Sequence, residues 1–107
     1  MKLSPTAYQS ICLGKKTIEM RLNDEKRSVI KVGDKIEFEN IVSHQKMKCS
    51  VIDLRRYRNF FELYDNYEKS LLGYEEKQLA NAEDMYTYYS PEQINLYGVV
   101  AIVIKIT

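Results

Sequence analysis

The stretch GKKTIEMRL, Gly14–Leu22, has the pattern of a β-strand close to the start of the 107-residue chain. Its apolar residues Ile18 and Met20 alternate with polar ones, and side chains along a strand point to opposite faces with a period of two. If Ile18 and Met20 point into a core, the other face carries a polar row: Thr17, Glu19 and Arg21. The sequence therefore predicts a strand over about Thr17–Leu22 that presents charge to a partner or to solvent.

The composition indicates one folded domain over residues 1–107, with 45% hydrophobic and 29% charged residues. No apolar run approaches the roughly 20 residues that span a bilayer, and the N-terminus lacks the apolar segment of a signal peptide. We therefore expect no membrane contact and a cytoplasmic location. Cys12 and Cys49 are too few and too far apart for a disulfide framework or a zinc site, so both are expected to be buried apolar residues.

Charge is distributed unevenly along the chain, although the formal net charge is only +1. Residues 1–58 carry 13 Lys and Arg against 7 Asp and Glu, whereas residues 59–97 carry 2 against 8. A basic half of this kind can present one face to an anionic partner. The alternative is that both sets of charges are solvated surface.

The first half of the chain predicts one helix and three strands. Ser4 followed by Pro5 is typical of a helix start, and Gly14 of its end. After a polar loop, a Val-Gly-Asp turn leads into a strand in which Ile36 and Phe38 alternate with charged residues. A long third strand is predicted over Lys46–Tyr57.

The second half predicts a helical insertion and a buried last strand. Asn59 can cap a helix over FFELYDNY, and further helical pieces are expected over 67–72 and 75–85. Ser90-Pro91 repeats the helix-start signal, with Gln93 completing a capping box. The segment VVAIVIKI is apolar on both faces, which is typical of a central strand. The predicted fold is α+β, a mixed β-barrel with flanking helices and a helical insertion before the last strand.

Three segments carry a resemblance to a known family: SICLGKKTIEMRL, VGDKIEFEN and LYGVVAIVIKI. They are similar to the signature segments of the ASCH domain, a member of the PUA-like superfamily, in its small prokaryotic-type single-domain form. The resemblance covers nearly the whole chain, and its most specific part is the pattern at Gly14, Lys15, Lys16, Glu19 and Arg21. It implies a PUA-like barrel with a charged cleft beside it, and RNA or a nucleoside-type molecule as ligand.

The chemistry of this pattern follows from a carboxylate placed among cations. Neighbouring positive charges keep Glu19 ionised by lowering its pKa, so it would act as an acceptor or a base. Arg21 could grip a phosphate or carbonyl, Lys16 could stabilise an oxyanion, and Lys15 is a further candidate ligand contact. The alternative is a cross-strand ion pair on an exposed face, worth at most about 1 kcal/mol.

The resemblance also raises a hydrolytic alternative. In the branch of the family that acts as amidohydrolases on acetylated cytidine, a threonine nucleophile lies three positions after the second lysine. This chain has Glu19 at that position, with Thr17 as a possible substitute. A hydrolase acting on modified nucleosides or on RNA would then use Lys16 and Glu19 as its catalytic pair, with the carboxylate activating water.

Two further groups of residues are candidate RNA contacts. Among nine tyrosines, Tyr89 in MYTYYS is the best candidate to stack on an unpaired base, the alternative being a core edge with its hydroxyl in water. The segment RRYRNF supplies Arg55, Arg56 and Arg58, of which Arg56 and Arg58 share one face of a strand. The sequence as a whole predicts no metal site and no cofactor. Besides ligand binding and hydrolysis, a third alternative is a protein that serves only as an interaction module.

Overall fold

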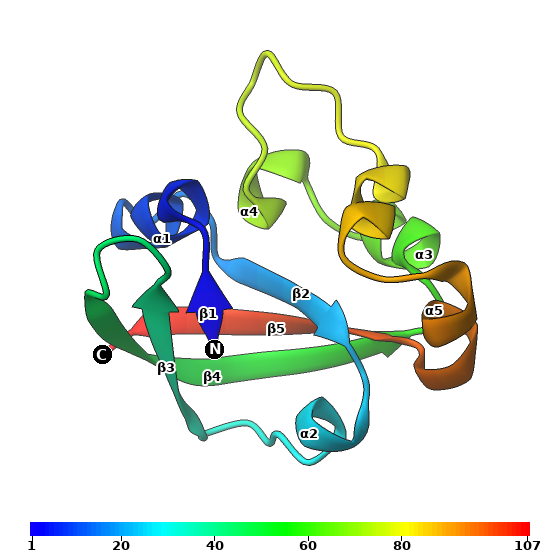
Figure 1. Cartoon of the computed structure of the whole chain (residues 1–107), viewed down its shortest axis with the longest axis horizontal. Coiled ribbons are helices and arrows are strands. Elements are labelled where there is room, and N and C mark those ends of the chain that lie inside the picture. Colours follow the sequence, from blue (N-terminus) through cyan, green and yellow to red (C-terminus); the bar gives the residue numbers. More distant parts are fainter.

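The structure, a computed structural model that describes all residues 1–107, is built on a curled five-stranded sheet (Figure 1). The order of strands across the sheet is β1 (Lys2–Leu3), β3 (Lys35–Asn40), β4 (Lys46–Tyr57), β5 (Val99–Ile106) and β2 (Ile18–Leu22). β1 runs parallel to β3, and all other neighbours are antiparallel. The sheet is therefore a half-barrel with β1 and β2 at its two edges.

The helices lie on both sides of the sheet. They are α1 (Pro5–Cys12), α2 (Glu25–Ser28), α3 (Phe60–Asp65), α4 (Lys69–Leu72), the 3₁₀ helix η1 (Ala82–Thr87) and α5 (Pro91–Tyr97). α1 packs against β1 and β3, whereas α3, α4 and α5 belong to the insertion between β4 and β5 and pack against β2, β4 and β5. Figure 1 shows this insertion gathered beside β2. The predicted α+β class with a helical insertion before the last strand is confirmed.

The caps predicted from the sequence are present. Ser4 accepts a hydrogen bond from the backbone N–H of Ala7, and Asn59 accepts one from Glu62. Ser90 and Gln93 form the expected capping box. Because these caps satisfy N–H groups that a helix leaves unpaired, they fix where each short helix begins.

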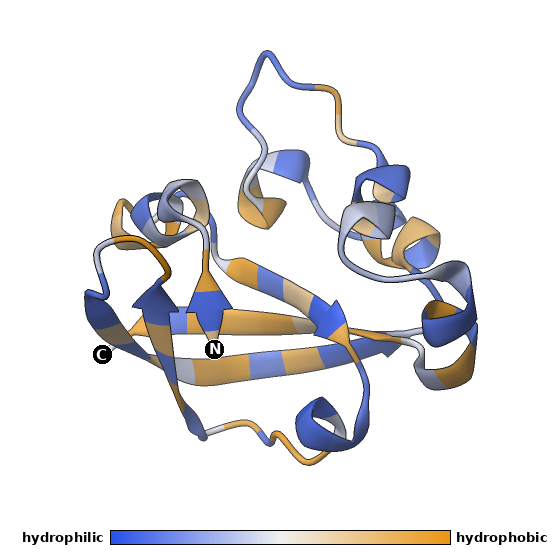
Figure 2. Cartoon of the chain, in the orientation of Figure 1, coloured by the Kyte–Doolittle hydropathy of each residue, from blue (hydrophilic) through white to orange (hydrophobic).

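Two hydrophobic cores lie on the two faces of the sheet, and β5 contributes to both. Val99 and Ala101 point into the core beneath the insertion, whereas Val100 and Ile102 point into the core beneath α1. All four side chains are fully buried. Figure 2 shows the hydrophobic residues running along β5. The absence of polar alternation in this strand is thus explained by burial on both faces, as predicted.

Several predictions of detail are wrong. Cys49 is buried as expected, but Cys12 is exposed, because it follows the buried Ile11 by one residue and a helix turns through about 100° per residue. The helix expected over 75–85 begins only at Ala82, as a 3₁₀ helix. Residues 75–80 form an exposed loop, held by hydrogen bonds from Lys69 Nζ to the carbonyls of Glu76 and Gln78.

Two short elements fall outside the sequence prediction. β1 has only two residues, too few for any alternation to show, and it pairs with β3. α2 lies in the expected polar loop and is capped by Asp24, whose side chain accepts from the backbone N–H of Arg27 and pairs with its guanidinium at 2.7 Å. β1 also places the backbone carbonyl of Lys2 within hydrogen-bond distance of Arg21 in β2.

Candidate functional site

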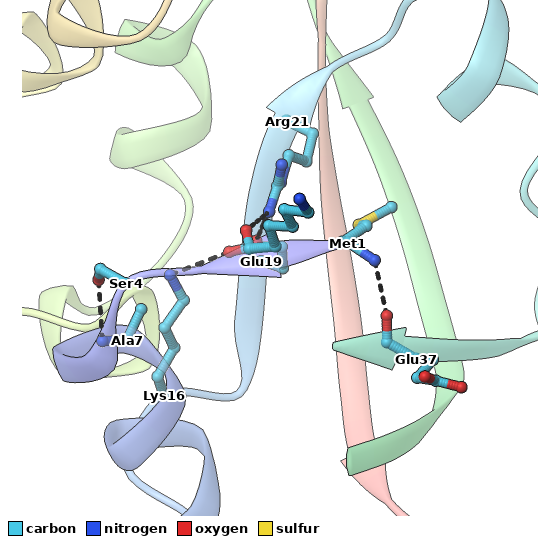
Figure 3. A network of polar contacts seen from close by, with 8 residues as sticks. Met1, Ser4, Ala7, Lys16, Glu19, Arg21 and Glu37 are labelled. Carbon is cyan, nitrogen blue, oxygen red and sulfur yellow. Dashed lines mark hydrogen bonds and ion pairs between the residues drawn. The ribbon is translucent and has the colours of Figure 1, made fainter. Parts of the chain in front are cut away.

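Two residues of β2, Glu19 and Arg21, form a compact group of charges with Lys16, which precedes the strand, and we call these three residues the triad. Lys16 Nζ lies 3.0 Å from Glu19 Oε1. Arg21 donates from Nε and Nη2 to Glu19 Oε2, at 2.9 and 2.7 Å. Figure 3 shows the three side chains pointing toward one another. The sequence prediction therefore brings these residues together correctly, but Glu19 is only 3% exposed, so the carboxylate is not on an open surface.

The alternation of β2 explains how a charge comes to be buried there. Ile18 and Met20 point into the core beneath the insertion. Glu19 lies opposite Ile102 in the strand register and Arg21 opposite Val100, two residues of the core beneath α1. The triad therefore lies on the α1 side of the sheet, at its edge.

Arg21 also links the two edges of the half-barrel. Its Nη2 donates to the backbone carbonyl of Lys2 in β1 at 2.9 Å, in addition to its contacts with Glu19. β1 and β2 are not paired by the sheet ladder. A side chain thus connects two edge strands that the backbone leaves unpaired.

The charges of the triad depend on one another. Burial alone would raise the pKa of Glu19, but Lys16 and Arg21 outweigh it and hold that pKa below its usual range. Burial would lower the pKa of Arg21, and Glu19, with a smaller contribution from Tyr89, raises it instead. At neutral pH the triad therefore contains two cations and one carboxylate, and carries a net charge of +1.

A pocket of about 610 Å³ opens beside the triad, within the range of roughly 300–1,000 Å³ that small-ligand sites occupy. The triad, Lys2 and the first turn of α1 line one part of it. The insertion supplies the aromatic part: Tyr64, Tyr74, Tyr88 and Tyr89. The pocket therefore combines a positively charged end with rings that can stack on a planar ligand.

Two of these rings differ in what they can offer a ligand. Tyr89, the predicted stacking residue, lines the pocket, but its ring is stacked on Phe60 with centroids 6.0 Å apart and an interplanar angle of 12°. Tyr88 is 70% exposed, and its ring lies 6.4 Å from that of Tyr89. Tyr88 is therefore the ring with more free surface, a distinction that the run MYTYYS does not reveal.

Gly73 leaves room for the side chain of Lys16 to reach Glu19. The glycine ends α4 with φ of +108°, a conformation that residues with a Cβ rarely adopt. A Cβ on Gly73 would lie 3.1 Å from Lys16 Cδ. The close approach of the end of α4 thus holds the lysine stem in place beside the carboxylate.

The remaining predicted site residues lie elsewhere. Lys15 is exposed and does not line the pocket. Arg55 forms an ion pair with Asp53, and Arg58 forms one with Glu62. Arg56 donates to the side chain of Asn23 and to the backbone carbonyl of Ser28. Arg56 and Arg58 border a separate hollow that is more open to solvent. The arginine segment and the triad are thus two distinct surfaces, and the RNA contacts proposed for the former stay predictions.

No group of three or more His, Cys, Asp or Glu is arranged to hold a metal ion. None of the helices combines the length and the apolarity that crossing a bilayer requires.

Comparisons with known proteins point to one family. The model of the ASCH domain matches residues 1–107. The crystal structure of the hypothetical protein PH0355 is similar with a TM-score of 0.80 and 31% identity, covering 100% of both chains. The solution structure of protein PF0455 from Pyrococcus furiosus has a TM-score of 0.67 and 33% identity, over 99% of this chain and 97% of that one. A search of curated proteins gave no match.

Proposed function

The chain belongs to the ASCH domain family, with its PUA-like fold, and from that membership we propose that it binds a nucleoside-type ligand in the pocket beside the triad. The ligand is a free nucleoside or nucleotide, or an unpaired nucleotide of an RNA. The observation that carries the proposal is the joining of a buried, net positive triad to exposed aromatic surface in one pocket of ligand size.

The triad offers donors to an anionic or carbonyl group. Arg21 has five N–H donors, of which three are used in its contacts with Glu19 and Lys2, so two are left for other partners. Glu19 fixes both cations in place, and donors that are held in advance cost less entropy when a ligand binds. A phosphate oxygen or a base carbonyl is the ligand group that fits them.

The rings of the insertion offer stacking to a base. Unpaired bases are commonly held between aromatic side chains, each stack being worth about 1–3 kcal/mol. Tyr88 has the exposed ring, and Tyr89 beside it is supported from behind by Phe60. We therefore assign the base to Tyr88 and the phosphate or carbonyl group to the triad.

Binding is better supported than hydrolysis. Both oxygens of Glu19 are engaged by cations, and its lowered pKa makes it a weak base. Thr17, the hydroxyl considered as a substitute nucleophile, does not line the pocket. Hydrolysis of an acetylated cytidine nevertheless has a direct readout, product release, and detecting turnover would replace the binding proposal with the enzymatic one.

The test is calorimetric titration of the four ribonucleoside 5′-monophosphates into the parent protein and two variants. Tyr88→Ala removes the exposed ring, and we expect it to weaken binding by about 1–3 kcal/mol. Tyr86→Ala is the matched control, because Tyr86 is a half-exposed tyrosine two residues before Tyr88 and does not line the pocket. The proposal fails if no nucleotide binds the parent, or if both variants bind alike.

A further inference from the structure

A chain of hydrogen bonds runs through the part of the pocket wall that the insertion supplies. The hydroxyl of Tyr64 lies 2.8 Å from that of Tyr74, and the Tyr74 hydroxyl donates to Asp84 Oδ2 at 2.7 Å. All three residues line the pocket, and Asp84 lies on its exposed side. The sequence pattern does not predict these hydrogen bonds, since Tyr74 is ten residues away from each partner along the chain.

The direction of these hydrogen bonds can be worked out from proton counting. A tyrosine hydroxyl has one proton, and that of Tyr74 is used toward Asp84, with the backbone carbonyl of Asn81 at 3.3 Å as a second acceptor. The bond between the two tyrosines must therefore be donated by Tyr64. Burial raises the pKa of both hydroxyls, so both keep their protons at neutral pH.

One oxygen of Asp84 is left over. Oδ2 accepts from Tyr74, whereas Oδ1 makes no hydrogen bond or ion pair within the protein. Because Tyr74 fixes Oδ2, the free oxygen is held as an acceptor at the edge of the pocket. The pocket thus offers donors at the triad and an acceptor on the insertion, so a complementary ligand must carry both an acceptor and a donor.

We propose that Asp84 is a specificity-determining residue, whose free carboxylate oxygen accepts a hydrogen bond from a donor group of the bound nucleotide. The inference rests on the proposed function and adds to it a hydrogen-bond donor of the nucleotide that the protein recognises. Two groups of a nucleotide have the required chemistry: a ribose hydroxyl and an exocyclic base amine, both of which carboxylates accept from in other proteins. Tyr74 is a positioning residue, because it orients the carboxylate without itself reading the ligand.

The test uses Asp84→Asn, which keeps shape and exchanges an acceptor for a donor. Tyr74 still donates to the remaining carbonyl oxygen of the amide, so the new NH₂ group replaces the free oxygen and meets the ligand's donor. We expect the affinity for cytidine 5′-monophosphate to fall about tenfold or more. Glu83→Gln is the matched control: it removes the same charge from the neighbouring exposed position, which does not line the pocket, and should leave affinity unchanged.

Two analogues of the ligand identify the donor. One lacks the 2′ and 3′ hydroxyls, and the other carries two methyl groups on the exocyclic amine. If Asp84 reads the ribose, the dideoxy analogue binds the parent weakly and Asp84→Asn makes no further difference to it. If Asp84 reads the amine, the dimethylated analogue behaves in this way.

Three results would overturn the inference. Unchanged affinity of Asp84→Asn for cytidine 5′-monophosphate would remove Asp84 from recognition and leave the proposed function standing. Equal losses for the parent ligand and both analogues would show a general disturbance of the pocket, which also contradicts a specific donor contact. If no nucleotide binds the parent, the proposed function and the inference fall together, so the two failures are distinguishable.

Discussion

Replacing Glu19 by glutamine should destabilise the protein strongly, because it removes the only negative charge of the triad. The Lys16 and Arg21 side chains are only 11% and 16% exposed, so each would keep a partly desolvated charge without its counter-ion. Removing one partner of a buried ion pair costs roughly 3–5 kcal/mol. The pocket lets some water reach both cations, and glutamine retains one acceptor oxygen, so we expect Glu19→Gln to lower the free energy of unfolding by about 2–4 kcal/mol.

The effect of this substitution should depend on pH in a defined direction. The folded-state pKa of Glu19 is lowered from a reference value of 4.5 by Lys16 and Arg21, against the opposing effect of burial. Its stabilisation is therefore fully present above the unfolded-state pKa and is lost as pH falls through the lower folded-state pKa. The difference between parent and Glu19→Gln should be constant near neutral pH and shrink in acid.

The assay is urea unfolding of the parent and of Glu19→Gln, from neutral pH down into the acid range where the carboxylate becomes protonated. Glu37→Gln is the control, since Glu37 is half exposed and pairs with Lys46 at 3.5 Å, a contact worth at most about 1 kcal/mol. A loss at Glu19 no larger than at Glu37, or a loss that persists unchanged in acid, would refute the view that the triad is a buried ion cluster.

Three further predictions concern core packing, the contact between Gly73 and Lys16, and RNA binding. Ile102→Ala should cost about 2–5 kcal/mol in urea unfolding as a core cavity, whereas Ile52→Ala, at a half-exposed position, should cost under about 1 kcal/mol; the reverse ranking would contradict the strand facing. Gly73→Ala should cost about 1–3 kcal/mol through its positive φ, and it should weaken nucleotide binding by displacing Lys16; calorimetry showing parent affinity in the folded variant would contradict this. If RNA contacts the arginine segment, replacing its three arginines together by neutral residues should weaken RNA binding and make it less dependent on salt concentration; the three are Arg55, Arg56 and Arg58. Salt titrations that match those of the parent would exclude that contact.

Local patterns predict the parts of the fold that local physics decides. The alternation in β2 correctly separates Ile18 and Met20 from Glu19 and Arg21, because a strand has no other way to arrange its side chains. The Ser90 cap and the unbroken apolar run of β5 predict their elements for similar reasons. The charged row of the candidate site was thus predictable from nine residues.

Other parts of the site depend on contacts between distant segments. The bridge from Arg21 to Lys2 requires β1, a two-residue strand that exists only because β3 lies beside it. The hydrogen bond between Tyr74 and Asp84 depends on the path of an exposed loop without regular structure. The sequence also does not reveal that Glu19 is buried, because its two partners are held by distant segments: Arg21 by the backbone of Lys2, and the stem of Lys16 by Gly73.

Whether the triad and the tyrosines form one ligand site can be measured by following the backbone amide signals of the protein by NMR while cytidine 5′-monophosphate is added. Binding in the pocket predicts shifts in β2 and η1, at Glu19, Arg21 and Asp84, and in the adjoining Tyr88 and Tyr89, with the hollow at Arg56 and Arg58 unchanged. Shifts confined to that hollow, or no shifts at millimolar nucleotide, would show that the triad and the tyrosines do not form one ligand site.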